Sequence, residues 1–184
     1  MQFASITREI EATPASYPAA PTGLSDAAAA IDPGIIWQRL ENWLRVRWSP
    51  RSVIWLLHES GEFLPPLEPF DIESVERFEL SEWVTADEIH PGAMGGVVLP
   101  RTGPYRVTAT VGADNAPDTT AQEAYRRLAE FLADGQGEFK PGIRSMRASV
   151  GDVTTAISRD ANFLAKAVAS SGAFDLLRHL RRIK

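Results

Sequence analysis

Two neighbouring segments with opposite hydrophobic periodicities constrain the fold of this chain most strongly. In residues 105–111 apolar residues alternate with polar ones, as in a strand with one buried face. Residues 120–134 instead place apolar residues at the three- and four-residue spacing of a helix. Thr120 and Glu123 match a capping box for that helix, and Asp118 is a competing N-cap. The chain therefore needs both strands and helices.

Two further helices are predicted, at residues 33–47 and 158–182. The first begins with Asp32 as N-cap and Pro33 at the first helical position. The second contains many small residues, with Gly172 as a break or kink. Both predictions rest on local signals alone.

Residues 51–111 are predicted to form β structure, because short runs of β-branched and aromatic residues alternate with turns containing Pro and Gly. Residues 97–99 and 105–111 are expected to pair as a hairpin through residues 100–104. Residues 72–83 have mixed periodicity. We interpret them as a strand, with a short helix as the alternative.

The predicted fold class is α+β, with a small antiparallel β region, helices packed with it and an extended, Pro- and Ala-rich N-terminal arm. Its strands lie within about 51–111 and its helices at about 33–47, 120–134 and 158–182. The expected domains are an N-terminal arm at 1–34, an α+β core at 35–139 and a basic C-terminal helical segment at 140–184.

The overall net charge of −5 is unevenly distributed along the chain. Residues 140–184 contain nine Lys or Arg and three Asp or Glu, a net charge of +6. Residues 1–139 contain the other ten basic and 21 acidic residues, a net charge of −11. Such a division favours contact with partners of different charge, or with a neighbouring copy of the same chain.

Several functional classes find little support in the sequence. The chain has no cysteine, which removes disulfides and thiolate metal sites. It has no apolar run long enough for a membrane span and no secretory signal pattern, so we expect synthesis in the cytosol and no membrane partner. Its three histidines are far apart, and no nucleophile elbow or Walker loop is present. We therefore expect no catalytic residue, metal or cofactor.

Five tryptophans are many for a chain of 184 residues. Most are interpreted as an aromatic core beneath the first helix, because tryptophan contributes a large buried area. Trp48 and Trp83 are the candidates for a subunit interface, together with Tyr105 and Arg106.

The C-terminal end combines apolar and cationic residues. We predict that it docks into a groove of another protein as an amphipathic segment. The predicted docking residues are Phe174, Leu177, Arg178, Leu180, Arg181, Arg182, Ile183 and Lys184. Binding of the basic residues to a nucleic-acid backbone is the alternative. If the segment is an anchor, a chain that ends at Ser171 should stay folded and lose its attachment.

The order of the motifs in residues 97–184 resembles that of the head–tail connector (adaptor) proteins of tailed bacteriophages. Residues 100–117 read PRTGPYRVTATVGADNAP and precede an Ala- and Leu-rich helix. They are followed by SVGD at residues 149–152, by SGAFDLL at residues 171–177, and by the basic end. Family members usually open with two longer helices, whereas this chain has a Pro- and Ala-rich arm and one short helix.

The resemblance implies a non-enzymatic subunit of a homo-oligomeric ring, typically of twelve copies, in the neck of the virion. The ring would dock on the portal protein through residues 173–184. Its β region would face neighbouring subunits or the downstream neck, stopper or tail terminator protein. DNA would pass through the lumen without specific binding. Two alternatives are a small nucleic-acid-binding or regulatory protein and a hydrolase that uses the carboxylates of residues 71–88.

Overall fold

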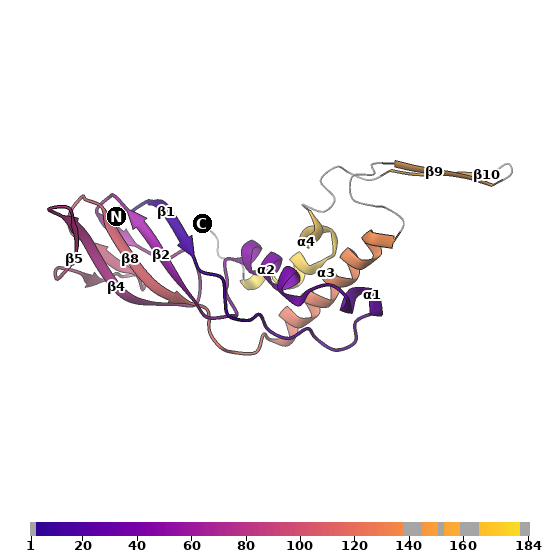
Figure 1. Cartoon of the computed structure of the whole chain (residues 1–184), viewed down its shortest axis with the longest axis horizontal. Coiled ribbons are helices and arrows are strands. Elements are labelled where there is room, and N and C mark those ends of the chain that lie inside the picture. Colours follow the sequence, from indigo (N-terminus) through magenta and orange to yellow (C-terminus); the bar gives the residue numbers. More distant parts are fainter. Residues whose placement is uncertain (1–2, 138–144, 151–152, 159–165, 181–184) are drawn as a thin grey trace. The chain divides into compact units, whose positions relative to one another are not determined.

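The computed structural model describes residues 3–137, 145–150, 153–158 and 166–180. The chain forms two compact units (Figure 1). The β unit comprises Met1–Ser16 and Arg45–Asn115, and the helical unit comprises Tyr17–Leu44 and Ala116–Lys184. The segments of the two units thus alternate along the sequence. These boundaries differ from the division into arm, core and tail that the sequence suggested, while the α+β class is confirmed.

The β unit consists of two antiparallel sheets. A five-stranded sheet has the order β1-β2-β8-β4-β5, and a three-stranded sheet has the order β3-β7-β6. The strands are β1 Ile6–Glu11, β2 Arg51–Leu57, β3 Gly61–Phe63, β4 Phe70–Glu79, β5 Glu82–Thr85, β6 His90–Pro91, β7 Val97–Leu99 and β8 Tyr105–Val111.

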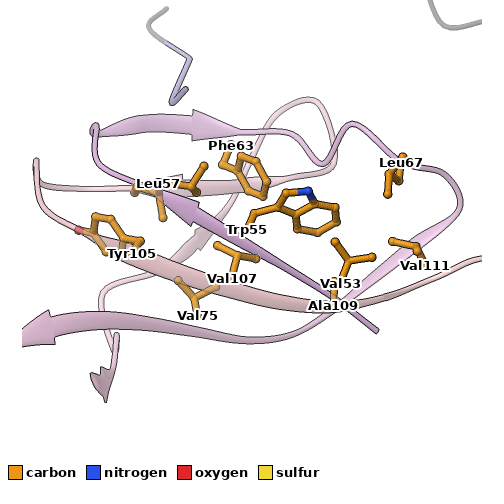
Figure 2. Packing of buried hydrophobic residues seen from close by; sticks show 11 residues of the cluster. Val53, Trp55, Leu57, Phe63, Leu67, Val75, Tyr105, Val107, Ala109 and Val111 are labelled. Atoms are coloured by element: carbon orange, nitrogen blue, oxygen red, sulfur yellow. The ribbon is translucent and has the colours of Figure 1, made fainter. Parts of the chain in front are cut away.

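Side chains from both sheets share one hydrophobic core (Figure 2). Alternate residues of the central strands β2 and β8 are buried, because successive side chains of a strand point to opposite faces. Trp55 of β2 meets Phe63 of β3 with 5.5 Å between ring centroids, which joins the two sheets. The core residues are Val53, Trp55, Leu57, Phe63, Leu67, Val75, Leu99, Tyr105, Val107, Ala109 and Val111. The expected packing of this region with the helices is not confirmed.

The expectation of an extended arm over residues 1–34 is wrong for residues 6–11. They form β1, which pairs antiparallel with β2 at one edge of the five-stranded sheet. Most of the strand is exposed, so its sequence has no clear burial pattern. Later in the same region, Asp26–Ala29 form the short helix α1.

Ion pairs hold the end of β1 against the β unit. Glu11 accepts hydrogen bonds from Arg47 Nε at 2.6 Å and Nη2 at 2.8 Å, and from Arg51 Nη1 at 3.2 Å. The two arginine side chains are almost fully buried. Burial alone would raise the pKa of Glu11, but the hydrogen bond and charge of Arg47, with the charge of Arg51, outweigh it and lower that pKa. The carboxylate therefore binds two buried arginines at once and links β1 to residues 47–51.

The predicted hairpin between residues 97–99 and 105–111 is also wrong. The first segment is β7, which pairs with β3 and β6. The second is β8, which lies between β2 and β4 in the other sheet. The hairpin was predicted because the two segments are close in sequence. In the structure, β8 is a long strand that pairs along its length with two other long strands, β2 and β4.

Residues 72–83 form β structure, as predicted, but they contain a turn that the sequence did not signal. Strands β4 and β5 make an antiparallel hairpin through Leu80 and Ser81. Both residues have positive φ, 47° and 73°. Tight hairpin turns need positive φ at their central positions and usually use Asn or Gly there. Without those residues the turn was not recognisable.

In the helical unit, α3 contacts each of the other α-helices. Trp37 of α2 meets Tyr125 of α3 with 4.8 Å between ring centroids. The described helices are α1, α2 Pro33–Leu44, α3 Thr119–Gly137, α4 Ala167–Ser170, α5 Ala173–Leu176 and the 3-10 turn Arg178–Leu180.

The start of α2 is confirmed, because Asp32 Oδ1 accepts a hydrogen bond from the Gly34 amide at 2.7 Å. For α3 the cap is Asp118, whose Oδ1 accepts from the Ala121 amide at 2.7 Å. The competing signal was therefore the correct one, and Thr120 is not the N-cap.

The prediction of one helix over residues 158–182 is wrong. Ser145–Val150 and Val153–Ser158 form an antiparallel two-stranded sheet, β9 and β10. The described helical residues after it are divided among α4, α5 and the 3-10 turn. The expected break at Gly172 is confirmed, since it has φ of +75° between α4 and α5. Among the described residues, no helix has the length and apolar character needed to cross a bilayer.

Candidate functional site

An aromatic–arginine cluster lies on the side of the five-stranded sheet that faces away from the core. We call Glu76, Phe78, Trp83 and Arg106 the Trp83 cluster. Phe78 and Trp83 are cross-strand partners in β4 and β5, with ring centroids 5.2 Å apart. The guanidinium carbon of Arg106 in β8 lies 4.7 Å from the centroid of Trp83. This distance fits a cation–π contact.

Glu76 fixes the position of Arg106. Its two carboxylate oxygens accept hydrogen bonds from Arg106 Nε at 2.6 Å and Nη2 at 2.8 Å. The hydrogen bond from Arg106 lowers the pKa of Glu76, and the same bond raises the pKa of Arg106. A bidentate pair of this kind restricts the orientation of the guanidinium group. The cluster therefore presents a pre-oriented arginine over an indole ring.

Apolar side chains near the cluster are also accessible. Phe78 is 42% exposed, and Leu80, at the turn that follows, is fully exposed. Ile10 of β1 is 43% exposed and lies on the same outward face as Arg106, at the opposite edge of the sheet from Trp83. Such a concentration of aromatic, aliphatic and arginine side chains is typical of protein–protein interfaces.

Two of the four predicted interface residues meet in this cluster, and two do not. Trp83 and Arg106 are in contact. Tyr105 is 1% exposed and belongs to the core, because adjacent residues of one strand point to opposite faces. It therefore does not lie on the outward face of the sheet that carries the cluster. Trp48 is half-buried and lies before β2, outside the cluster.

Sequence reasoning missed Glu76 and Phe78. Both lie in β4 at positions that face their partners in the neighbouring strands: Glu76 opposite Arg106, and Phe78 opposite Trp83. To identify these residues, the pairing of β4 with β8 had to be known. That pairing joins residues about 30 positions apart in the sequence. An acidic residue opposite an arginine is recognisable only once the register is known.

The C-terminal residues predicted to dock on a partner are partly used inside the helical unit. Phe174 packs edge-on against Trp43, with 4.8 Å between ring centroids, and Leu177 is completely buried. Leu180 is half-buried and Arg178 is exposed. The remaining predicted docking residues, Arg181, Arg182, Ile183 and Lys184, lie outside the described residues. Truncation after Ser171 would thus remove core residues, which argues against the expectation that such a chain stays folded.

Several carboxylates of the acidic stretch 71–88 are bound to donors of the β unit. Glu76 binds Arg106, Glu79 binds Arg77, and Glu88 binds Arg101 at 2.7 Å. Glu73 accepts a hydrogen bond from the Thr110 hydroxyl. For Glu76 the hydrogen bond from Arg106 lowers the pKa of the carboxyl group. A general acid needs the opposite, a carboxyl group whose pKa is raised.

No protein-family model matches this sequence, and no curated protein is significantly similar to it. The function is therefore inferred from the residues of the chain, from their geometry, and from the order of motifs described above. In the part of the chain that the structure describes, the Trp83 cluster is a well-defined surface feature.

Proposed function

We propose that this protein is a structural subunit of a phage neck ring that docks on the portal protein and links the capsid to the tail. The observation that carries the proposal is the Trp83 cluster on an exposed sheet face. Trp and Arg dominate the energetics of protein–protein interfaces, and here they are already held in one orientation. A surface of this kind is a means of assembly.

The charge distribution supports a head-to-tail contact between copies. Residues 1–139 have a net charge of −11 and residues 140–184 of +6, so the basic part of one subunit complements the acidic part of the next. A contact between two different surfaces generates a ring when the rotation closes. The resemblance gives twelve copies for such a ring. An acidic lumen would let DNA pass without binding it.

The two-stranded sheet of β9 and β10 also favours assembly. Among the described residues, neither strand pairs with a third. A two-stranded ribbon is marginally stable on its own in water. Pairing or packing with another subunit, the portal, or a downstream stopper or tail terminator would stabilise it. The proposed location is the virion neck, after synthesis in the host cytoplasm.

The structure changes the role proposed for the C-terminal end. Because Phe174 and Leu177 pack within the helical unit, portal docking would rely on Arg178, Leu180 and the residues that follow. The contact would be more electrostatic than the sequence suggested, and added salt should weaken it.

Replacement of Trp83 with Ala should weaken ring assembly by about thirtyfold, because a central interface tryptophan contributes about 2 kcal/mol or more. Trp83 lies on an edge strand and is only half-buried, so the change should leave the fold intact. Analytical ultracentrifugation over a concentration series measures the loss. Thermal unfolding checks the fold.

The matched control is Met94→Ala. Met94 is a large apolar residue that is 61% exposed in a loop of the same unit, outside the cluster. Assembly of this variant should equal that of the unmodified chain. Equal assembly by the Trp83 variant would refute the role of the cluster.

A further inference from the structure

A second feature of the β unit is a cavity beside the β4–β5 hairpin. It has a volume of about 440 Å³, and its walls come from β4, β5, residues 86–89, residues 100–101 and the first residue of β8. This volume lies in the range of small-ligand sites. The Trp83 cluster does not line it, so the cavity is a separate site.

One wall of the cavity contains a buried hydroxyl group without a hydrogen-bond partner in the described part of the chain. Tyr105 lines the cavity and is 1% exposed, and its hydroxyl has no such partner. Figure 2 shows the hydroxyl at the outer end of the core, directed away from the other labelled side chains. Buried hydroxyl groups are usually bonded. The Tyr105 hydroxyl is therefore available to a hydrogen-bonding group bound in the cavity.

The charges of the lining favour a cation. Arg77 is paired with Glu79, and Arg101 donates to both oxygens of Glu88 at 2.7 and 2.8 Å. Each arginine is thus already neutralised. Asp87, the third carboxylate of the lining, is exposed and has no ion pair or hydrogen bond within the described ranges. A bound anion would be repelled by the three carboxylates of the lining. A bound cation could pair with the carboxylate of Asp87, which no arginine occupies.

The remaining lining favours a cation on an alkyl chain over a metal ion. Within the described residues, no group of three His, Cys, Asp or Glu side chains is placed to hold a metal. Apolar residues instead form part of the wall, and the stems of Lys and Arg pack well on such surfaces. These lining residues are Val84, Ala86, Ile89 and Pro100.

We propose that this cavity binds a guanidinium or ammonium group carried on an alkyl chain, with Asp87 as the counter-ion and the Tyr105 hydroxyl as an acceptor. A basic segment of protein supplies such groups, and so does a free small cation. Because the chain itself ends in basic residues, its own residues 178–184 are the first probe. The choice of this peptide as a probe rests on the proposed ring. The proposed cation site does not depend on the ring.

Calorimetric titration of the full chain at low salt tests the site with two probes: a peptide of residues 178–184 and N-acetylarginine amide. We expect Asp87→Asn to weaken binding at least tenfold. We expect Tyr105→Phe to weaken binding severalfold without lowering the melting temperature, because the subunit itself does not use the hydroxyl. Asp114→Asn, which removes an exposed carboxylate of the same unit outside the cavity, should bind normally.

If only the peptide binds, the source of the cation is a protein segment. If both probes bind equally well, the source is a small free cation. Either result supports the site. Absence of binding by both probes, or equal losses in Asp87→Asn and Asp114→Asn, would overturn it. The ring is measured separately through Trp83, so the two proposals can fail independently.

Discussion

Replacement of Glu11 with Gln is expected to destabilise the β unit by about 3 kcal/mol, because the change removes the charge of a carboxylate that two buried arginines bind. Arg47 and Arg51 are 3% and 4% exposed, and both donate to this carboxylate. Urea unfolding measures the loss. Hydrogen exchange, followed by mass spectrometry, should show that β1 opens first, since it lies at the edge of its sheet.

Glu88→Gln is the control for that prediction. It makes the same chemical change in the pair with Arg101, whose side chains are both more than half exposed, so less than about 1 kcal/mol should be lost. A similar small loss in the Glu11 variant would contradict the account of β1.

Acid provides a second readout of the Glu11 pair. The folded-state pKa of Glu11 lies below the ordinary value of 4.5, so the unfolded chain binds the proton more readily. The stabilisation by Glu11 is complete above the ordinary value and is lost as pH falls through the lowered one. Unmodified chain and Gln variant should therefore become more alike in stability as pH falls through this range.

Replacement of Leu177 with Ala should destabilise the helical unit by about 3 kcal/mol, because it leaves a cavity at a completely buried position. The residue follows α5, which packs against α3, so the loss should appear in the unfolding of that unit. Urea unfolding with hydrogen exchange resolved along α3 measures it.

Arg178→Ala provides the comparison, since Arg178 is the next residue and is exposed. It should change stability by less than about 0.5 kcal/mol. The two variants compare the effect on stability of a buried residue with that of its exposed neighbour. Unchanged stability in the Leu177 variant, together with lost attachment to a partner, would show that Leu177 is an anchor, as the sequence suggested.

Local signals in the sequence were sufficient for the elements that depend on neighbouring residues. Asp32 and Pro33 determine the start of α2, and the alternation of residues 105–111 identifies β8. The pairing of β7 and the existence of β1 were not predictable in this way. Both depend on contacts between distant residues, and β1 is too exposed for burial to leave a pattern.

The same distinction holds for the candidate site. Trp83 and Arg106 were recognisable from composition, because Trp and Arg are enriched at interfaces. Tyr105 could not be separated from Arg106 without knowing which face of β8 is buried. The residues that complete the cluster, Glu76 and Phe78, required the register of β4. In residues 153–158 the β-branched residues favoured a strand, and the small residues nearby obscured that signal.

Native mass spectrometry of the full chain, alone and mixed with a phage portal protein as its proposed partner, tests most directly whether this protein is an assembly subunit. We predict one closed ring, of twelve copies by the resemblance, that forms in at least the mixed sample. A monomer that persists in both samples at concentrations up to about 100 μM would contradict the account.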